Sequence, residues 1–160
     1  MKHTNDQVAK AFARGGIAES GNLSAKNYIL KSYNTHIGVI TNGICYLSED
    51  NHSATTSKHI GLAHRAARLA GYEVVCTEIF SYGNHIGPEY FQKKNDQVAM
   101  ELFNRAVACY EKSKRARIYK SNWMDSAGRY LKQAMMLCQD ILDHFDTRQA
   151  CLFTAIKSSY

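Results

Sequence analysis

The spacing of apolar residues changes several times along the chain, and each change predicts a new element. Thr4 can cap a short helix over residues 5–14, which ends at the pair Gly15-Gly16. The next stretch, residues 16–22, is dominated by small and polar side chains and predicts a loop. The N-terminal part is therefore expected to form one helix followed by irregular chain.

A β-hairpin is the strongest local signal in the sequence. Residues 28–33 have a strand-like pattern, and so do the two halves of residues 36–48. The dipeptide Asn42-Gly43 separates these halves, and it suits the positive φ angles of a type I′ turn. The two halves are therefore predicted to pair as a hairpin at 36–48.

An amphipathic helix is predicted at about residues 56–70, after the polar residues 49–53. Its apolar positions recur at helical spacing: Ile60, Leu62, Ala63, Ala66, Ala67, Leu69 and Ala70. Hydroxyl side chains at its start can cap it, and Gly71 can end it. Residues 72–80 predict a further strand, and residues 81–88 predict a loop.

The C-terminal part is predicted to be helical. Pro88 fits the first turn of a helix. Residues 95–114 and 121–145 each carry one apolar stripe, and both stripes need cover, so the two helices are expected to pack as an antiparallel pair. Residues 147–157 fit a short helix or a strand, and the pattern does not decide between them.

These elements predict an α+β fold in a single domain over residues 1–160. A chain of 160 residues is long enough for one domain with a hydrophobic core. It would hold a small antiparallel sheet with the 36–48 hairpin, the packed helix at about 56–70 and the C-terminal helical pair. Its parts would be an N-terminal helix (5–14), an α/β part (23–80) and a helical part (88–146).

Composition supports a folded protein and favours anionic partners. The chain is 45% hydrophobic and 21% charged, which is ordinary for a globular protein and excludes wholesale disorder. No run approaches the ~18 apolar residues of a membrane span. The polar N-terminus does not resemble a secretory signal, so a cytoplasmic location is expected. The net charge of +6 is compatible with nucleic acid as a partner.

The first candidate binding site is the hydroxyl-rich box at the start of the predicted helix, which consists of Thr55, Thr56, Ser57, Lys58 and His59. A helix start exposes backbone N–H groups and the positive end of the helix dipole. Hydroxyls, a lysine and a histidine added there would suit a phosphate or a nucleic-acid backbone. The alternative is ordinary helix capping with a solvated lysine.

The same box underlies a resemblance. A hairpin followed by Thr-Thr-Ser-Lys-His, and later an Arg-Ala-Arg segment before an amphipathic helix, resembles small uncharacterised proteins of phages and mobile elements. The resemblance covers residues 28–60 and 105–145. In such proteins a tyrosine often precedes the box, whereas here His52 stands nearby. Proteins of this size and origin include anti-CRISPR inhibitors of bacterial defence, so the resemblance implies a non-enzymatic inhibitor in the cytoplasm of a bacterial host.

The second candidate binding site is a basic run between the two C-terminal helices. Its cations follow one another without an acid and are interleaved with aromatic residues: Lys112, Lys114, Arg115, Arg117 and Lys120, with Tyr119 among them and Tyr110 and Trp123 beside them. This composition suits a phosphate backbone with stacking partners, or an acidic protein surface. The alternative is a solvated corner between helices.

Catalysis and metal binding have no clear motif. The five cysteines, at positions 45, 76, 109, 138 and 151, include no C-x2-C pair and are expected to be reduced core residues. His52, His59 and His64 are not spaced as metal ligands, so no catalytic residue, metal or cofactor is predicted. A Cys–His pair using His36 or His85, in a small hydrolase or transferase, is a minor alternative.

Together these features predict a non-enzymatic accessory protein of a phage or mobile element. It would bind a nucleic-acid-handling complex, such as a CRISPR effector, or nucleic acid itself, and would have no membrane partner. The alternative function is direct DNA or RNA binding in phage regulation. The sequence leaves the identity of the partner and the oligomeric state open.

Overall fold

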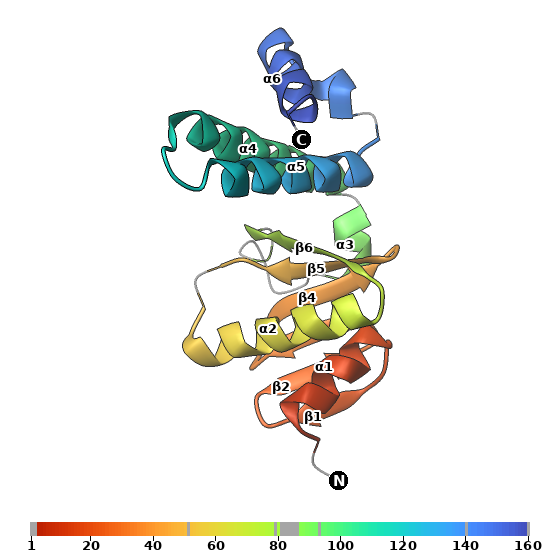
Figure 1. The fold of residues 1–160 in the computed structure, drawn as a ribbon. Helices are drawn as coiled ribbons and strands as arrows, with labels where there is room; N and C mark the ends of the chain where they lie inside the picture. The colour runs from red at the N-terminus through yellow and green to blue at the C-terminus, as the bar shows by residue number, and fades with distance from the viewer. Residues whose placement is uncertain are drawn as a thin grey trace. The chain divides into compact units, whose positions relative to one another are not determined.

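The computed structural model describes residues 3–50, 52–78, 80, 87–92, 94–139 and 141–159. Contacts within the chain divide it into two compact units, Met1–Gln92 and Lys93–Tyr160 (Figure 1). The first unit holds the N-terminal helix and the α/β part, and the second holds the C-terminal helices. The expectation of a single domain stays a prediction.

The first unit contains a meander of five antiparallel strands. They are β1 (Ala18–Ser20), β2 (Leu23–Lys26), β3 (Ile29–Ser32), β4 (Thr35–Thr41) and β5 (Ile44–Ser48). The loop expected at residues 16–22 was wrong, because β1 lies inside it. Ala18 is buried and pairs with Ala25, so one inward-facing side chain suffices to fix a short edge strand.

The predicted hairpin is confirmed, since β4 and β5 pair around Asn42-Gly43. Asn42 has φ 51° and Gly43 has φ 78°, as a type I′ turn requires. A second turn with two positive φ angles, at Asn27 (50°) and Tyr28 (66°), joins β2 to β3. This turn has no glycine, which explains why the sequence pattern did not mark β2.

Gly43→Val is expected to lower the free energy of unfolding by about 1–3 kcal/mol, because a β-branched residue is strained at positive φ. A Cβ at Gly43 would meet nothing within 4 Å, so backbone strain alone would cause the loss. Urea unfolding measures it. Gly61→Val is the matched control, because Gly61 lies in a helix with equally open space. Equal stability of the two variants would contradict the turn assignment.

The sixth strand pairs differently from the others. Helix α2 (Ala54–Leu69) leads through Gly71, at φ 87°, to β6 (Glu73–Thr77), which lies parallel to β5 with Cys45 opposite Val74. The sheet therefore has six strands in the order β1–β6 and is mostly antiparallel. This arrangement confirms the α+β fold. The predicted antiparallel sheet holds for the first five strands, and β6 departs from it because the crossover helix α2 returns the chain in the same direction.

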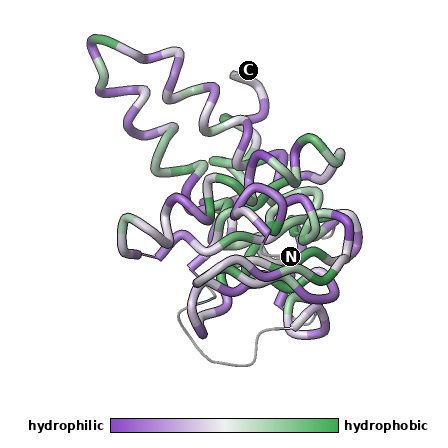
Figure 2. Tube along the Cα trace, turned by 90° about the horizontal axis from the view of Figure 1, so that it is seen from below, coloured by the Kyte–Doolittle hydropathy of each residue, from purple (hydrophilic) through white to green (hydrophobic). Residues whose placement is uncertain are grey.

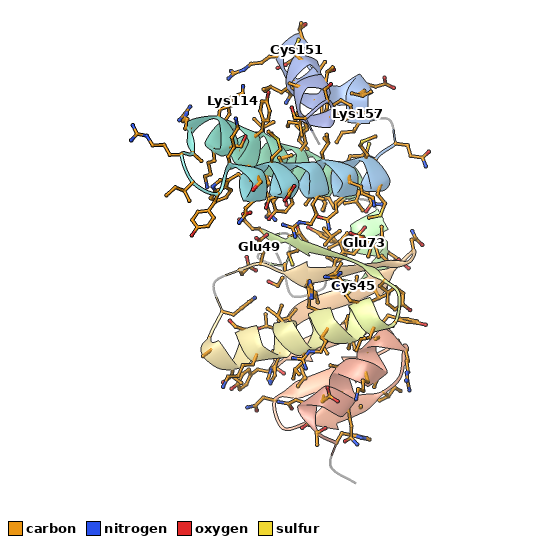
Figure 3. The ribbon with its side chains drawn as sticks, in the orientation of Figure 1. Cys45, Glu49, Glu73, Lys114, Cys151 and Lys157 are labelled. Carbon is orange, nitrogen blue, oxygen red and sulfur yellow. The ribbon has the colours of Figure 1, made fainter. Side chains whose placement is uncertain are left out.

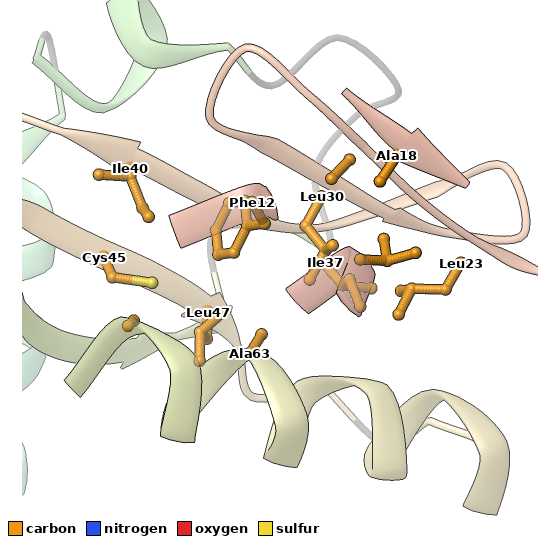
Figure 4. Packing of buried hydrophobic residues seen from close by; sticks show 12 residues of the cluster. Phe12, Ala18, Leu23, Leu30, Ile37, Ile40, Cys45, Leu47 and Ala63 are labelled. Carbon is orange, nitrogen blue, oxygen red and sulfur yellow. The ribbon is translucent and has the colours of Figure 1, made fainter. Parts of the chain in front are cut away.

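Two helices cover one face of the sheet. Helix α1 (Asn5–Ala13) begins at Thr4, which forms the predicted cap together with Gln7, and packs beside α2 (Figure 1). Between these helices and the sheet lies a core that includes Phe12, Leu30 and Leu47 (Figure 4).

The opposite face is covered at β4 by the short helix α3 (Pro88–Gln92), which begins at Pro88 as predicted. The rings of Tyr46 and Phe91 stack there with centroids 4.4 Å apart. Phe80 adds a third ring, 5.1 Å from Phe91. Most of the predicted loop at residues 81–88 lies outside the described residues.

The second unit consists of helices. They are α4 (Asn95–Arg115), α5 (Lys120–Leu137), the 3₁₀ helix η2 (Ile141–His144) and α6 (Thr147–Lys157). The antiparallel pair is confirmed by α4 and α5, which pack along their length (Figure 1). The helix expected over residues 121–145 was wrong at its end: α5 stops at Leu137, because Cys138 is extended, with φ −136° and ψ 104°. Residues 147–157 are helical, capped by Asp146 and Gln149.

All five cysteines are free, but they are not all core residues. Cys45, Cys109 and Cys138 are buried, and Cys76 is partly buried. Cys151 is exposed, which corrects the expectation for this residue; it lies on α6 away from the buried side chains of that helix (Figure 3). The sequence pattern did not decide between helix and strand for residues 147–157, so it could not show which of their side chains face outward.

Among the described helices, none combines the length and apolar character that crossing a membrane requires. Figure 2 shows the same property along the chain, because hydrophilic and hydrophobic residues alternate over short distances.

Candidate functional site

The basic run forms the tip of the α4/α5 helical hairpin. Helix α4 ends at Arg115, Ala116 is extended with φ −74° and ψ 128°, and α5 starts at Lys120. The chain therefore reverses within four residues, and the charged side chains of the run are exposed. We call residues 112–123 the basic tip. Lys114, near the end of α4, marks it in Figure 3.

All candidate residues of the basic tip are exposed: Lys112, Lys114, Arg115, Arg117, Tyr119 and Lys120. Ile118 and Tyr119 are 71% and 69% exposed, which is high for side chains of this size. The structure therefore brings the five predicted cations together with apolar side chains at one end of the hairpin. Ile118 lies inside the basic run, but the pattern of cations and aromatic residues did not mark it because it is neither.

Aromatic rings hold two of the lysines at the tip. Lys112 Nζ lies 4.8 Å from the centroid of the Trp123 ring, and Lys114 Nζ lies 4.3 Å from that of Tyr110. Lys114 also lies 3.3 Å from Glu111 Oε1. Within the described ranges, Arg115, Arg117 and Lys120 form no ion pair. These three therefore keep their full charge for a partner.

Two features of the tip reduce the stability of the hairpin. Tyr119 has φ 62°, a left-handed conformation that a bulky residue rarely adopts and that costs about 1–2 kcal/mol. Lys120 is the first residue of α5, where the positive end of the helix dipole disfavours a cation. The first turn of α5 contains no acid, and Tyr119 makes no capping hydrogen bond with its side chain. Neither residue therefore stabilises the start of the helix.

The hydroxyl-rich box is divided between the two sides of α2. The helix begins at Ala54, and its cap is Ser53, whose Oγ accepts a hydrogen bond from the Thr56 N–H. Thr56 and His59 are buried, whereas Thr55, Ser57 and Lys58 are exposed. Because the helix starts at Ala54, about two residues earlier than expected, all five residues of the box occupy helical positions. Phosphate binding stays a prediction for its three exposed members.

His59 joins a buried hydrogen-bond network. Its ring is 2% exposed; Nδ1 lies 2.8 Å from Ser32 Oγ, and Nε2 lies 3.1 Å from Asn5 Nδ2. Because Asn5 Nδ2 can only donate, Nε2 accepts, and Nδ1 carries the proton and donates to Ser32. Ser32 Oγ also lies 3.1 Å from Thr56 Oγ1. The network ties α1, α2 and β3 together.

The burial of His59 makes stability dependent on pH. Burial lowers the pKa of His59 below its ordinary value of 6.5, so the folded protein binds fewer protons there than the unfolded chain. The contribution of neutral His59 to the free energy of unfolding is complete above pH 6.5, the pKa in the unfolded chain. It falls as the pH drops from 6.5 to the lower pKa of His59 in the folded protein, and it is lost below that pKa. Urea unfolding between about pH 5 and pH 7.5 measures this slope. The slope should be smaller in His59→Gln; an unchanged slope would contradict the assignment.

Ser48, Asp50 and His52 form a second polar cluster after β5. Ser48 Oγ donates to Asp50 Oδ2 at 3.0 Å and lies 2.8 Å from His52 Nε2. A hydroxyl has one hydrogen, so His52 must donate to Ser48 and cannot accept its proton. Ser48 is also buried. The cluster fixes the loop and does not provide an activated nucleophile.

Other catalytic and metal-binding arrangements gain no support. Burial raises the pKa of the thiols of Cys45 and Cys109, which keeps them protonated and weakly nucleophilic at neutral pH. Of the residues that the structure describes, no three His, Cys, Asp or Glu are placed to hold a metal ion. His85, one member of the alternative Cys–His pair, lies outside the described residues.

Comparison with known proteins identifies a family for the first unit. Residues 2–83, just over half of the chain, match the model of a family of unknown function, DUF8033. The chain belongs to this family. The match covers most of the first unit and none of the α4/α5 hairpin. No curated protein and no solved structure matches the chain.

Proposed function

We propose that the protein is a non-enzymatic binding protein whose basic tip holds nucleic acid, with single strands preferred over duplex. The observation that carries the proposal is the exposed combination of three unpaired cations, Arg115, Arg117 and Lys120, with Tyr119. Cations attract the phosphate backbone, and an aromatic side chain stacks on a base that is not held in a duplex. Because every base has a π-face, such a site would bind many sequences.

The strain at Tyr119 supports this proposal. A tyrosine in the left-handed region is disfavoured, and Asn adopts the same backbone more easily. The tyrosine ring is mostly exposed and so contributes little packing within the chain. A strained, exposed aromatic residue among cations is best explained by contact with a partner.

Tyr119→Asn is therefore expected to separate stability from binding. The free energy of unfolding should stay equal or rise by up to about 1 kcal/mol, because strain is relieved. Affinity for single-stranded DNA should fall by about 1–3 kcal/mol, the contribution of one stacked base. Urea unfolding and fluorescence anisotropy measure the two effects. A loss of stability without a loss of affinity would assign Tyr119 a structural role.

A second candidate function is inhibition of a nucleic-acid-handling protein complex, as in an anti-CRISPR-type inhibitor of phage origin. Ile118 favours it, because an aliphatic side chain that is 71% exposed fits an apolar pocket better than a phosphate backbone. The cations around Ile118 would then match an acidic surface of the complex that ordinarily binds no nucleic acid. A basic channel would repel them and is therefore excluded as the target.

Gel-shift titrations with labelled single-stranded DNA, RNA and duplex of one sequence test the main proposal. The single strands should bind most tightly, with a slope of log affinity against log salt near about −3.5 if all five cations contact phosphates. Absence of any shift at about 50 mM salt would overturn it. Co-purification with a host nuclease complex, together with weak binding to naked nucleic acid, would favour the inhibitor.

A further inference from the structure

The first unit carries a hollow on the face of the sheet opposite α1 and α2. On this face Lys31 of β3 stands opposite Ser24 of β2 on one side and opposite His36 of β4 on the other. Lys26, two residues after Ser24, points to the same face because side chains alternate along a strand. Three strands therefore align two lysines and an imidazole in neighbouring positions.

The hollow has a volume of about 210 Å³. Its lining consists of Ser24, Lys26, Asn27, Ile29, Lys31 and His36. No acidic residue is part of this lining. The nearest acid by strand register is Glu19, which pairs with Ser24 and lines a neighbouring, wider hollow together with both lysines. This volume lies below the range of about 300–1,000 Å³ that is typical of sites for drug-sized ligands, so the hollow suits a small group such as a single anion and not a folded partner.

The two lysines are not neutralised within the unit. Lys26 and Lys31 are diagonal neighbours on adjacent strands, at a typical separation of about 7–8 Å. Neither forms an ion pair in the parts of the chain that the structure describes. Two neighbouring like charges destabilise a sheet, and a bound anion between them removes that repulsion.

We propose that this hollow binds the phosphate group of a small phosphate monoester. A phosphate monoester carries a charge of about −1.5 to −2 at neutral pH and three acceptor oxygens. Two ammonium groups match the charge of a phosphate monoester better than they match the single charge of a carboxylate. The Ser24 hydroxyl, the Asn27 amide and the His36 ring provide further hydrogen-bond donors, and Ile29 offers an apolar surface to the carbon skeleton.

The proposal goes beyond nucleic-acid binding at the basic tip, because it concerns another unit and a ligand of different size. Apart from Asn27, which lies in the turn between β2 and β3, the donors come from three hydrogen-bonded strands, whose register shifts once, between Leu30 and Lys31. A site built on strands holds its donors more rigidly than one built on loops.

The test is a titration of the full chain with inorganic phosphate, a nucleoside monophosphate, the same nucleoside without phosphate, and a dicarboxylate. Binding is followed by calorimetry and by NMR shifts of the backbone amides. Inorganic phosphate and the monophosphate should bind and should shift the amides of Ser24, Lys31 and His36. The neutral nucleoside should not bind at this hollow.

Lys26→Gln and Lys31→Gln should each weaken monophosphate binding by about tenfold or more, the effect of losing one charge-assisted hydrogen bond. Lys10→Gln is the matched control, because Lys10 is an exposed lysine of α1, on the other side of the sheet. It should change affinity less than twofold. The lysine variants should keep the melting temperature of the wild type, so that a loss of affinity is not a loss of fold.

Several outcomes would overturn the proposal. These are no binding of the monophosphate at about 10 mM, far above a typical metabolite affinity, equal binding of the dicarboxylate, or an equal loss in Lys10→Gln. A 5′-phosphorylated oligonucleotide distinguishes the source of the phosphate. If it binds this hollow more tightly than its 5′-hydroxyl counterpart and the mononucleotide, the phosphate belongs to a strand end, and the phosphate site itself is supported.

Discussion

Replacing Arg115, Arg117 and Lys120 together by glutamine is expected to weaken binding to single-stranded DNA. The loss of affinity should be about a hundredfold greater at 0.1 M salt than at 1 M salt. Each cation that leaves a phosphate reduces the slope of log affinity against log salt by about 0.7, so the three together reduce it by about 2. The three side chains are exposed and form no ion pair within the described residues. Fluorescence anisotropy across a range of salt concentrations measures the slope.

The fold should survive this change, because substitutions of exposed residues usually alter stability by less than about 0.5 kcal/mol. The matched control replaces three other exposed cations of the second unit, Lys132, Arg148 and Lys157, by glutamine. It removes the same net charge from α5 and α6 and should leave the salt slope unchanged. An equal fall in both triple variants would show that net charge, and not the basic tip, determines binding.

Phe12→Ala is expected to lower the free energy of unfolding by about 3–5 kcal/mol, the largest single effect on stability. Phe12 is fully buried between α1 and the sheet. Its ring lies against Gly38 of β4, where an added Cβ would come within 3.2 Å of the ring. Removal of the ring would leave a cavity between α1 and the sheet.

Urea unfolding measures this loss, and Ile17→Ala is its control, because Ile17 is 73% exposed. Gly38→Ala gives an independent check. In the wild type it should destabilise by about 1–3 kcal/mol through overpacking. The added Cβ would come within 2.9 Å of Leu47 Cδ2 and 3.2 Å of Phe12 Cζ. In the Phe12→Ala background Gly38→Ala should cost less, because one of these overlaps is gone and Leu47 can move into the cavity. Additive effects of the two substitutions would contradict the contact.

Local signals predicted much of the fold. The Asn42-Gly43 turn, the cap at Thr4 and the helix break at Gly71 are set by residues within a few positions of each other, and all three occur as expected. Strand β1 was missed because it has only three residues, and β2 was missed because the turn after it, at Asn27 and Tyr28, has no glycine. The parallel pairing of β6 was missed because it depends on the whole crossover through α2.

The candidate sites, like the fold, were predictable where they depend on neighbouring residues and not where they depend on residues far apart in the sequence. The basic tip was predictable from its charge, since it lies in one continuous run of sequence, but the left-handed backbone of Tyr119 was not. The buried side of the hydroxyl-rich box depends on Ser32 and Asn5, far from His59 in the sequence. The phosphate hollow depends on the register of three strands, so Lys26 and Lys31 gave no signal in the sequence.

The two proposed binding sites lie on different segments of the chain, and only one of them lies in the segment that the family model matches, residues 2–83. The hollow with Lys26 and Lys31 lies inside it, whereas the α4/α5 hairpin lies outside. A substitution in the hairpin can therefore change the proposed target of the basic tip without altering any residue of the matched segment.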